Sequence, residues 1–583
     1  MTMGVWTKVT ERRPRLLLFA ALLAVVGLAF WLRLPGLADK PLHSDESVNG
    51  WFSLRLYWWN VYRYQPSDYH GPFLYYINLI LFWLLGPSET SLRLGPAVFG
   101  SLIPLLLWPL RRWMGGLGIL VSGLLLACAP AMVYFARTAI HEAYLLFFSL
   151  IWVIGLLHFL GRPRLAPALL AAVGACGAFC NKETAIITAG SLAFGLTIAW
   201  LFGRPNYDRV EGDRDLFGGR SQRQIVVSLV LRPWKALLAG VGVFFAGVVL
   251  FFSSFFSYSV SENYAAKLAP LPEWVVGVGA FFHAFIPWFE HGTSGRNQGK
   301  DWDYFWILMA DTQGLALALS VCAGCLALFT RHRFGLFLTG WSASSLAVYS
   351  AIPYKTPWCV LNIDLPCFLL CGWLASKCIE WARDGGIHPV ARVLSTVVPF
   401  VFLLPIIHLH GVSQLDNAAR FDDDAVEWVY VQTDRGFFDL VRDHLGVAAV
   451  DPDADGRGPD VVNVNGKNPI RWYTITRGWD HDRTRYYSWK KTQDALPEVE
   501  LLREAEIIVV VGPVKRRLSE LVGETGLEWH EETYPLRPGW KVVAWYRQDL
   551  WDSYQQTGGR ASVDWSALSG ESQLIPPKPR RYR

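Results

Sequence analysis

Long apolar stretches recur along most of the chain and alternate with short polar loops. A transmembrane helix needs about 20 predominantly apolar residues, and we count roughly eleven such stretches. They lie near residues 16–32, 92–110, 117–135, 140–160, 165–181, 184–203, 236–257, 304–329, 334–352, 358–376 and 390–411. The pattern predicts a mainly α-helical, polytopic membrane domain over residues 1–411.

The loop after the first span, residues 34–91, contains two apolar stretches that complicate this count. Residues 47–64 are rich in Trp and Tyr and include two arginines, as in a helix that lies in the membrane interface. Residues 73–85 are apolar but number only about 13, too few to span comfortably. Residues 274–289 form a similar stretch in a later loop. For 73–85 and 274–289, both an interfacial and a spanning position remain open.

Basic residues predict the orientation of the chain. They gather in loops that fall on the same side as the N-terminus: 111–112, 162–164, 204–235, 331–333 and 377–392. Cytoplasmic loops carry an excess of Lys and Arg, so we expect an integral plasma (inner) membrane protein with a cytoplasmic N-terminus. If residues 73–85 spanned, every later loop would change sides and this agreement would be lost.

After Gly411 the hydropathy becomes that of a soluble protein. Short β-like runs at 507–511 and 542–546 flank a helix-like run at 515–522. We predict a small extracytoplasmic α/β domain over residues 412–555, followed by a disordered tail at 556–583.

Composition supports the membrane assignment and excludes other classes. The chain of 583 residues is 52% hydrophobic, too apolar for one soluble core of this length. A net charge of +5, spread along the chain, gives no indication of a nucleic-acid partner. The cysteines lie almost wholly in apolar stretches, so no disulfide framework is proposed, and the Cys322/Cys325 pair is expected to pack within a helix.

The most informative polar segment follows the first span, where Asp45 and Glu46 stand side by side in the segment 41–47. This is where a lipid-borne substrate would arrive, and one carboxylate placed there can act as general base toward an acceptor hydroxyl. The competing interpretation is that Asp45 simply caps a helix that begins near Ser47, which is an ordinary role for Asp.

Further polar groups fall in the other outside loops. They are His70 in 69–72, Arg137 and Glu142 in 137–142, Lys182 in 181–183, and Lys355 in 354–358. A single charged turn between helices is usually a solvated helix end. Their repetition on one side of the membrane favours a common site.

Taken in order, these segments resemble the GT-C glycosyltransferase superfamily. The matching features are His43-Ser-Asp-Glu46, the stretch 69–78, Ser88-Glu-Thr-Ser-Leu-Arg93, Arg137 with a carboxylate five residues on, Asn181-Lys-Glu183 and Lys355-Thr-Pro-Trp358. The branch is that of the protein O-mannosyltransferases and bacterial aminoarabinose transferases (family 39-like), and the most similar members are prokaryotic flippase-activity-associated membrane proteins. The resemblance covers residues 15–380.

The resemblance implies a role for each matching position. Asp45 would be the catalytic base, and Glu46 and Glu142 would help to bind the acceptor or a metal. His70, Arg137, Lys182 and Lys355 would hold the phosphate of the donor; a divalent metal ion is left open as a cofactor. Position 142 is Glu where the superfamily usually has Asp, and position 70 is His where the aminoarabinose transferases have Lys.

These features predict an enzyme that transfers a sugar from a polyprenyl-phosphate-linked donor to a protein, glycan or lipid acceptor outside the cytoplasm. Such a donor already has a good leaving group, so one base and fixed cations suffice; we expect a single displacement with inversion. The alternatives are a lipid or glycolipid transporter or flippase component, and a scaffold that presents its soluble domain. No nucleotide-sugar or ATP site is apparent, because Gly512-Pro-Val-Lys515 lacks the Walker spacing.

Overall fold

The computed structural model describes residues 3–59, 70–204, 215–226, 228, 233–256, 273–294, 299–383, 389–390, 393, 396–397, 401–423, 425–426, 428–451, 459–465, 469–476, 483–487, 496–512 and 514–563. The end of the predicted interfacial helix (60–64), parts of the last predicted span (390–411) and the predicted tail beyond residue 563 lie outside them. The chain divides into two compact units.

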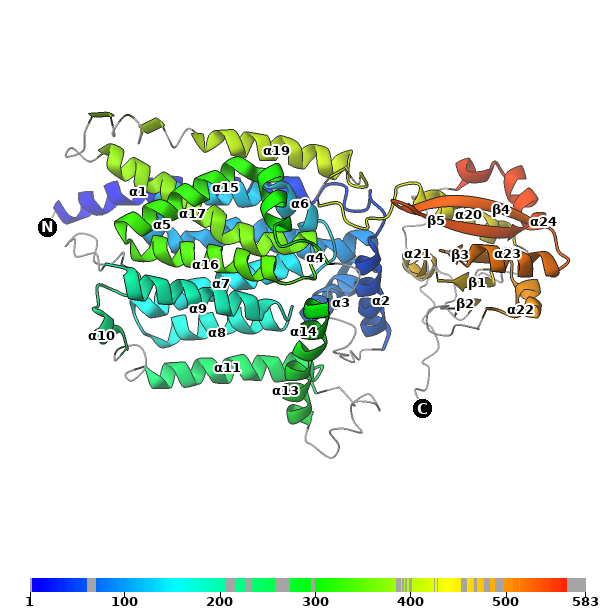
Figure 1. Cartoon of the computed structure of the whole chain (residues 1–583), viewed down its shortest axis with the longest axis horizontal. Helices are drawn as coiled ribbons and strands as arrows, with labels where there is room; N and C mark the ends of the chain where they lie inside the picture. Colours follow the sequence, from blue (N-terminus) through cyan, green and yellow to red (C-terminus); the bar gives the residue numbers. More distant parts are fainter. Residues whose placement is uncertain are drawn as a thin grey trace. The chain divides into compact units, whose positions relative to one another are not determined.

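The first unit comprises Met1–Pro35, Val61–Ile77 and Arg93–Arg420 and is built from helices (Figure 1). From the N-terminus they are α1 (Met3–Arg33), α3 (Phe73–Leu85), α4 (Glu89–Leu102), η1 (Ile103–Leu110), α5 (Arg111–Cys128), α6 (Pro130–Ala136), α7 (Glu142–Gly161), α8 (Leu165–Phe179), α9 (Ala185–Phe202), α10 (Gln222–Val226), α11 (Trp234–Phe252), α13 (Glu273–His283), α14 (Phe285–Ser294), α15 (Tyr304–Thr330), α16 (Arg333–Ala351), η3 (Pro357–Cys359), α17 (Val360–Arg383) and α19 (Leu403–Ala418). Helices α3 and α4 continue into the second unit.

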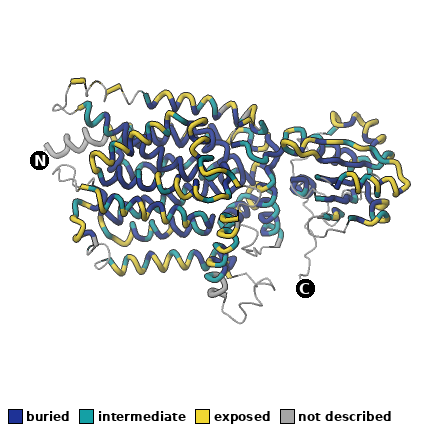
Figure 2. Tube along the Cα trace, in the orientation of Figure 1, coloured by how far each residue is buried: buried dark blue, intermediate teal, exposed yellow. Residues whose placement is uncertain are grey.

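Among the described residues, seven helical stretches are long and apolar enough to cross a membrane. They are Pro14–Arg33, Glu89–Cys128, Glu142–Gly161, Ala185–Phe202, Trp234–Phe252, Tyr304–Thr330 and Pro357–Arg383. Large apolar side chains such as Leu238 and Phe329 are exposed on the outer faces, and Figure 2 shows this exposure along α11 and α19. Such a surface suits contact with lipid, so the chain is an integral membrane protein of mainly α-helical fold.

The seven stretches account for eight of the eleven predicted spans. The 40-residue stretch Glu89–Cys128 covers two of them, because its helix is interrupted at Gly115, whose φ is 70°. Three predicted spans remain. The stretch 165–181 corresponds to α8 with 15 residues, and 334–352 corresponds to α16 with 19 residues. The third, 390–411, lies partly outside the described residues. The stretch 73–85 forms the 13-residue α3, with the bounds that its apolar pattern predicts.

The helices of the first unit pack in neighbouring pairs: α7 with α8, α9 with α16, and α5 with α17 (Figure 1). Small residues allow the closest approach. A Cβ at Gly372 of α17 would overlap the Gly118 carbonyl of α5, and Ser376 Oγ accepts a hydrogen bond of 2.8 Å from the Gly118 N–H. Because lipid tails are as apolar as leucine, such close contacts and interhelical hydrogen bonds are what hold membrane helices together.

The second unit comprises Gly36–Asn60, Asn78–Leu92 and Phe421–Arg583. It therefore joins the loop after the first span to the C-terminal region. Its further elements are α2 (Ser44–Trp59), α20 (Phe437–Val450), β1 (Val461–Val464), α21 (Ile470–Thr476), β2 (Thr484–Tyr487), α22 (Val499–Glu504), β3 (Ile507–Val511), α23 (Lys515–Glu524), β4 (Trp529–Arg537), β5 (Trp540–Arg547), α24 (Gln548–Gln556) and η5 (Gly559–Ser562).

The strands form one five-stranded sheet in the order β2-β1-β3-β5-β4. Strand β1 is parallel to β2 and β3, whereas β3–β5 and β4–β5 are antiparallel. Strand β3 consists entirely of buried Ile and Val, as expected for a central strand covered on both faces. The predicted α/β fold is confirmed, with β3 at its predicted bounds, β5 around the predicted strand and α23 around the predicted helix.

A buried carboxylate ties several of these elements together. Asp443 of α20 accepts hydrogen bonds from the hydroxyls of Tyr534 (2.6 Å) and Tyr554 (3.1 Å). It also accepts from the Arg560 guanidinium, at 2.9 Å from Nε and 2.6 Å from Nη2. Folded structure thus continues through η5, beyond residue 555.

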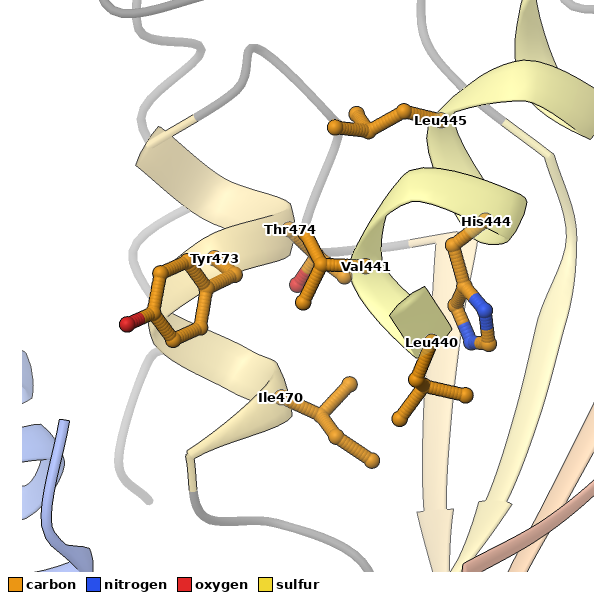
Figure 3. A pocket seen from close by; sticks show the side chains of 7 residues that line it. All are labelled: Leu440, Val441, His444, Leu445, Ile470, Tyr473 and Thr474. Atoms are coloured by element: carbon orange, nitrogen blue, oxygen red, sulfur yellow. The ribbon is translucent and has the colours of Figure 1, made fainter. Parts of the chain in front are cut away.

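Helix α20 packs against α21 along an apolar seam (Figure 3). Leu440 of α20 and Ile470 of α21 point into the same small pocket, which is lined almost wholly by apolar atoms. Tyr473 of α21 packs its ring against Phe437 at 5.9 Å. This packing fixes the position of α21, and hence of the Tyr473 hydroxyl.

Candidate functional site

Two short segments of the first unit that are far apart in sequence are joined through their backbones. The Gly71 N–H donates to the Asn181 carbonyl (3.1 Å), and the Phe73 N–H donates to the Cys180 carbonyl (3.0 Å). A Cβ at Gly71 would overlap the Cys180 carbonyl, so glycine is required for this approach. The consequence is that His70, just before α3, lies beside the loop that connects α8 to α9.

Four side chains pair at this junction, and we call them the paired-charge cluster: His70, Glu142, Lys182 and Glu183. His70 Nδ1 lies 2.7 Å from the Glu183 carboxylate, and Lys182 Nζ donates to Glu142. The Lys182 and Glu142 side chains are only 5% and 1% exposed. Buried ion pairs among apolar helices are rare in membrane proteins and mark functional sites more often than structural ones.

Aromatic rings enclose His70. The His141 ring meets it edge-on with centroids 4.9 Å apart, and Trp288 of α14 stacks on it at 4.3 Å. The His141 carbonyl accepts a hydrogen bond of 2.6 Å from the Asn181 amide. Desolvation, together with the charges of His70 and Lys182, lowers the pKa of His141 well below its ordinary value. His141 is therefore a neutral wall of the cluster at neutral pH.

The charge state of Lys182 is set by its partner. Desolvation lowers the pKa of Lys182, but Glu142, aided by Cys359 and Glu183, opposes it, and the net result is a raised pKa. The ammonium group thus stays charged at neutral pH. Cys359, at the end of η3, is also within electrostatic reach of Lys182, and its thiol lies 3.3 Å from Thr356 Oγ1.

Lys355 lies in the loop between α16 and η3. Its ammonium group donates to the carbonyls of Ile352 (2.6 Å) and Lys300 (3.1 Å). Desolvation lowers the pKa of Lys355, opposed by the carboxylates of Asp301 and Asp303. The loop that carries Lys355 thus approaches the paired-charge cluster through Cys359.

Arg137, between α6 and α7, has a different setting. Its guanidinium donates to the carbonyls of Arg33 (3.1 Å) and Pro35 (2.5 Å), at the end of α1. A cation at a helix C-terminus satisfies carbonyls that have no partner within the helix and complements the helix dipole. In this structure Arg137 therefore caps the first membrane helix.

In the second unit, Asp45 and Glu46 lie in the first turn of α2, and their environments differ. The Glu46 carboxylate is buried and accepts from the His43 N–H (2.9 Å), while His43 Nδ1 accepts from the Asp45 N–H (3.0 Å). This is the reciprocal pattern of a capping box, with His in place of Ser or Thr. The cap is formed by His43 and Glu46, and the side chain of Asp45 is exposed.

Residues of the C-terminal region hold this turn, and no pattern along the chain had indicated them. We call residues 430–433 the strap and residues 41–46 the Asp45 turn. The strap side chains Gln432 and Thr433 donate to the carbonyls of Pro41 (2.9 Å) and Leu42 (2.6 Å). The Leu42 N–H donates to the Tyr473 hydroxyl at 2.9 Å. Because His43 Nδ1 accepts from the Asp45 N–H, His43 Nε2 carries the proton. It donates to the carbonyl of Tyr430, the first strap residue (2.9 Å).

Comparison with known proteins agrees with this architecture. Residues 69–208 match the family described as dolichyl-phosphate-mannose-protein mannosyltransferase. The apo structure of ArnT from Cupriavidus metallidurans matches with a TM-score of 0.55 and 16% identity, over 92% of this chain and 98% of that chain. The same protein bound to undecaprenyl phosphate matches with a TM-score of 0.54 and 15% identity, over 91% and 97%.

The Archaeoglobus fulgidus oligosaccharyltransferase, tethered to an acceptor peptide, also matches, with a TM-score of 0.50 and 10% identity over 89% of this chain and 74% of that chain. The chain therefore has the membrane-protein fold of these transferases, the GT-C fold. No curated protein sequence matches this chain. The family match includes His70, Arg137, Glu142 and Lys182, so these candidate residues lie in the part of the chain that matches in sequence.

The structure brings together three of the seven candidate residues, His70, Glu142 and Lys182. It places Lys355 in a loop that reaches the same cluster. Asp45 and Glu46 share a turn in the other unit. Within the described residues, no three His, Cys, Asp or Glu side chains form a group that could hold a metal ion. The side chains of the described residues therefore do not fit a metal site.

Proposed function

We propose that this glycosyltransferase moves a sugar from a polyprenyl-phosphate-linked donor to an acceptor on the extracytoplasmic side of the membrane. The observation that carries the proposal is the paired-charge cluster, with two basic side chains held at fixed positions beside apolar helices. An anionic lipid headgroup needs such donors. The solved structures of ArnT with undecaprenyl phosphate and of the archaeal oligosaccharyltransferase with dolichol phosphate support this donor class.

In this proposal, His70 and Lys182 hold the donor phosphate, aided by Lys355 and Arg137. Glu183 and Glu142 orient the two basic groups, as carboxylates do when they pair with them. The cations also stabilise the charge that develops on the departing phosphate, because donors fixed in advance need not reorganise during the reaction. Lys182 fits this role since its raised pKa keeps it charged.

Asp45 is proposed as the general base. Its carboxylate is exposed, whereas Glu46 and His43 are committed to the helix cap. Asp45 takes the proton of the acceptor hydroxyl as the acceptor oxygen attacks the anomeric carbon. The bond from that carbon to the phosphate oxygen breaks, and the polyprenyl phosphate leaves with the electron pair. One displacement of this kind inverts the anomeric configuration.

The division of the chain into domains is part of the same proposal. Residues 1–411 form the membrane glycosyltransferase domain with the first loop at 34–91. Residues 412–555 form an extracytoplasmic domain, which α24 and η5 extend to Ser562, beyond the predicted start of the tail. The excess of basic residues in the predicted cytoplasmic loops supports this sidedness, with the N-terminus inside.

Replacing Asp45 with Asn tests the base. The protein, reconstituted in lipid nanodiscs, would be given a panel of polyprenyl-phosphate sugars and acceptors, and both released polyprenyl phosphate and glycosylated acceptor would be measured. We expect Asp45→Asn to lower transfer roughly a hundredfold or more while donor binding is retained. Asp39→Asn, an exposed carboxylate of the same loop, is the matched control and should keep full transfer.

Full transfer by Asp45→Asn would remove the base assignment. If the wild-type protein instead moved lipid-linked sugar across the bilayer without forming any glycosylated product, the transporter alternative would replace the enzyme. Product of unchanged anomeric configuration would contradict the single displacement.

A further inference from the structure

A pocket of about 670 Å³ opens in the second unit where β3 ends and α23 begins. Its other wall is the tip of the β4–β5 hairpin. We call it the hairpin pocket; its lining includes Asp434, Gly512, Lys515, Arg537, Trp540 and Lys541. The carboxyl end of a strand beside the N-terminus of a helix is where α/β sheets usually bind ligands.

The lining is predominantly basic. Arg537, Lys541 and Lys515 contribute three cations, against the single carboxylate of Asp434. The Lys515 ammonium group forms an ion pair of 2.7 Å with the Glu531 carboxylate, which lies outside the pocket lining. The Asp434 carboxylate accepts a hydrogen bond of 2.7 Å from the Gly436 N–H. Arg537 and Lys541 therefore dominate the field inside the pocket, which favours an anionic ligand.

Trp540 gives the pocket an apolar wall. Its indole is 42% exposed, although it is one of the largest side chains of the domain. The Arg537 guanidinium lies 4.8 Å from its ring centroid, which holds the two side chains together at the hairpin tip. Gly512 lies across the pocket, and a Cβ there would meet the Trp540 ring at 3.4 Å, an ordinary van der Waals contact. A cation beside an exposed indole suits a ligand with one acidic group and one flat, weakly polar face.

The hairpin pocket is electrostatically connected to the Asp45 turn. Desolvation lowers the pKa of Arg537, while the charges of Tyr430 and Asp45 oppose that shift. The proposed base thus lies within the field of a pocket cation. Asp434, on the pocket lining, directly follows the strap residue that bonds to Leu42.

We propose that the hairpin pocket binds an acidic sugar unit of a glycan acceptor, with Arg537 and Lys541 on its acidic group and Trp540 against the face of its ring. An acidic peptide could pair with Arg537 and Lys541, but it would have no flat ring to pack against the Trp540 indole. This inference rests on the proposed function, since it names the acceptor class for the same transfer. Its position next to the strap explains how an acceptor held by the C-terminal region would come near Asp45.

Binding can be measured without donor or turnover. Full-length protein in phosphatidylcholine nanodiscs would be titrated calorimetrically with a glucuronic acid tetrasaccharide and with the same tetrasaccharide after reduction of its carboxyl groups. We expect the acidic form to bind at least tenfold more tightly, and raised salt to weaken it. A phosphorylated tetrasaccharide shows whether phosphate serves as well as carboxylate.

The variants Arg537→Gln, Lys541→Gln and Trp540→Ala should each weaken binding of the acidic tetrasaccharide at least fivefold. Arg516→Gln on α23 is the matched control, because its side chain is 94% exposed and lies outside the pocket lining. Hydrogen exchange of the β4–β5 hairpin checks that each variant is folded. Two variants that alter different chemistry, charge and ring, protect the test against one of them misfolding.

Unchanged binding in the folded Arg537→Gln and Trp540→Ala proteins would overturn the site, and so would tighter binding of hexaglutamate than of the acidic tetrasaccharide. Asp45→Asn should still bind the tetrasaccharide. If transfer fails with every donor while this binding and its loss in the variants persist, the proposed function falls and the glycan site stands. If transfer proceeds equally well on neutral and acidic acceptors in all variants, the function stands and this inference falls.

Discussion

At the scale of single residues, the paired-charge cluster shows why type and position alone do not assign a role. Arg137 and Lys182 both follow membrane helices and both resemble phosphate ligands in the sequence. The structure gives Arg137 two carbonyls at the end of α1, whereas Lys182 pairs with Glu142. These partners lie about 100 and 40 residues away. The contacts of Arg137 thus give it a structural role, whereas Lys182 is an ammonium group paired with one buried carboxylate.

The Lys182–Glu142 pair separates stability from chemistry. Lys182→Met leaves the Glu142 carboxylate buried without its cation, which should destabilise the fold by about 3 to 5 kcal/mol. The double variant Lys182→Met/Glu142→Gln removes both charges, so we expect thermal stability to recover most of that loss while transfer stays below a hundredth of wild type. Thermal unfolding in nanodiscs and donor turnover would be measured on the same samples. If the double variant regains transfer together with stability, Lys182 has only a structural role.

At the scale of elements, the strap is the feature that most affects the proposed base. Gln432→Leu and Thr433→Val each remove one hydrogen bond to the backbone of the Asp45 turn. We expect kcat to fall about tenfold while donor affinity is unchanged, because the turn loses its fixed position and not its chemistry. Steady-state kinetics would separate the two parameters. Asn417→Leu is the control, since its side chain donates to the Ser413 carbonyl within α19 and not to the Asp45 turn. A loss of donor affinity in the strap variants would contradict the assignment.

Helix α20 should make the second unit sensitive to acid. His444 is buried, and desolvation lowers its pKa to about 3 from an ordinary value near 6.5. As pH falls below 6.5 the unfolded chain takes up a proton that the folded chain does not, so stability is full above pH 6.5 and is lost below it. At pH 5 the loss is about 2 kcal/mol.

Hydrogen exchange of α20 and β5 in the full-length protein, corrected for intrinsic rates, should therefore accelerate between pH 7 and pH 5. His444→Gln should remove that part of the pH dependence, because glutamine does not titrate. His530→Gln, on the partly exposed β4, is the comparison variant and should leave it intact. Equal acceleration in wild type and His444→Gln would show that another group is responsible.

Much of the element level could be predicted from local pattern. The all-apolar run of β3 and the 13-residue α3 have the bounds that their sequences indicate. The strap could not be predicted, because Gln432 and Thr433 are ordinary polar residues whose importance depends on contacts about 390 residues away. The hairpin pocket could not be predicted either, because Arg537 is an ordinary polar residue until the fold places it in the pocket lining. The capping box was also missed, since His43 stands where the usual pattern has Ser or Thr.

At the scale of the whole molecule, the sequence predicted a membrane protein with a small α/β domain, and the fold confirms it. Which polar segments pack together could not be predicted from the sequence. Residues 36–60 and 78–92 cluster with Phe421–Arg583, although in sequence they are flanked by membrane helices. Hydropathy assigns each segment to lipid or water, but it contains no information about which polar segments pack together.

The sidedness of the chain remains a prediction, and it can be decided by labelling single cysteines with a membrane-impermeant maleimide. Glu524→Cys lies on the exposed surface of the C-terminal domain, and Arg164→Cys lies in the loop between α7 and α8. The positive-inside rule predicts that Glu524→Cys labels in intact cells and that Arg164→Cys labels only after permeabilisation. The unsubstituted protein measures the background from its nine native cysteines. If α3 spanned the bilayer, every segment after it would change sides, whereas Asp45 precedes α3 and would keep its side. Labelling of Arg164→Cys in intact cells, with Glu524→Cys labelled only after permeabilisation, would therefore place the basic loops outside and the C-terminal domain inside, and would contradict the sidedness proposed above.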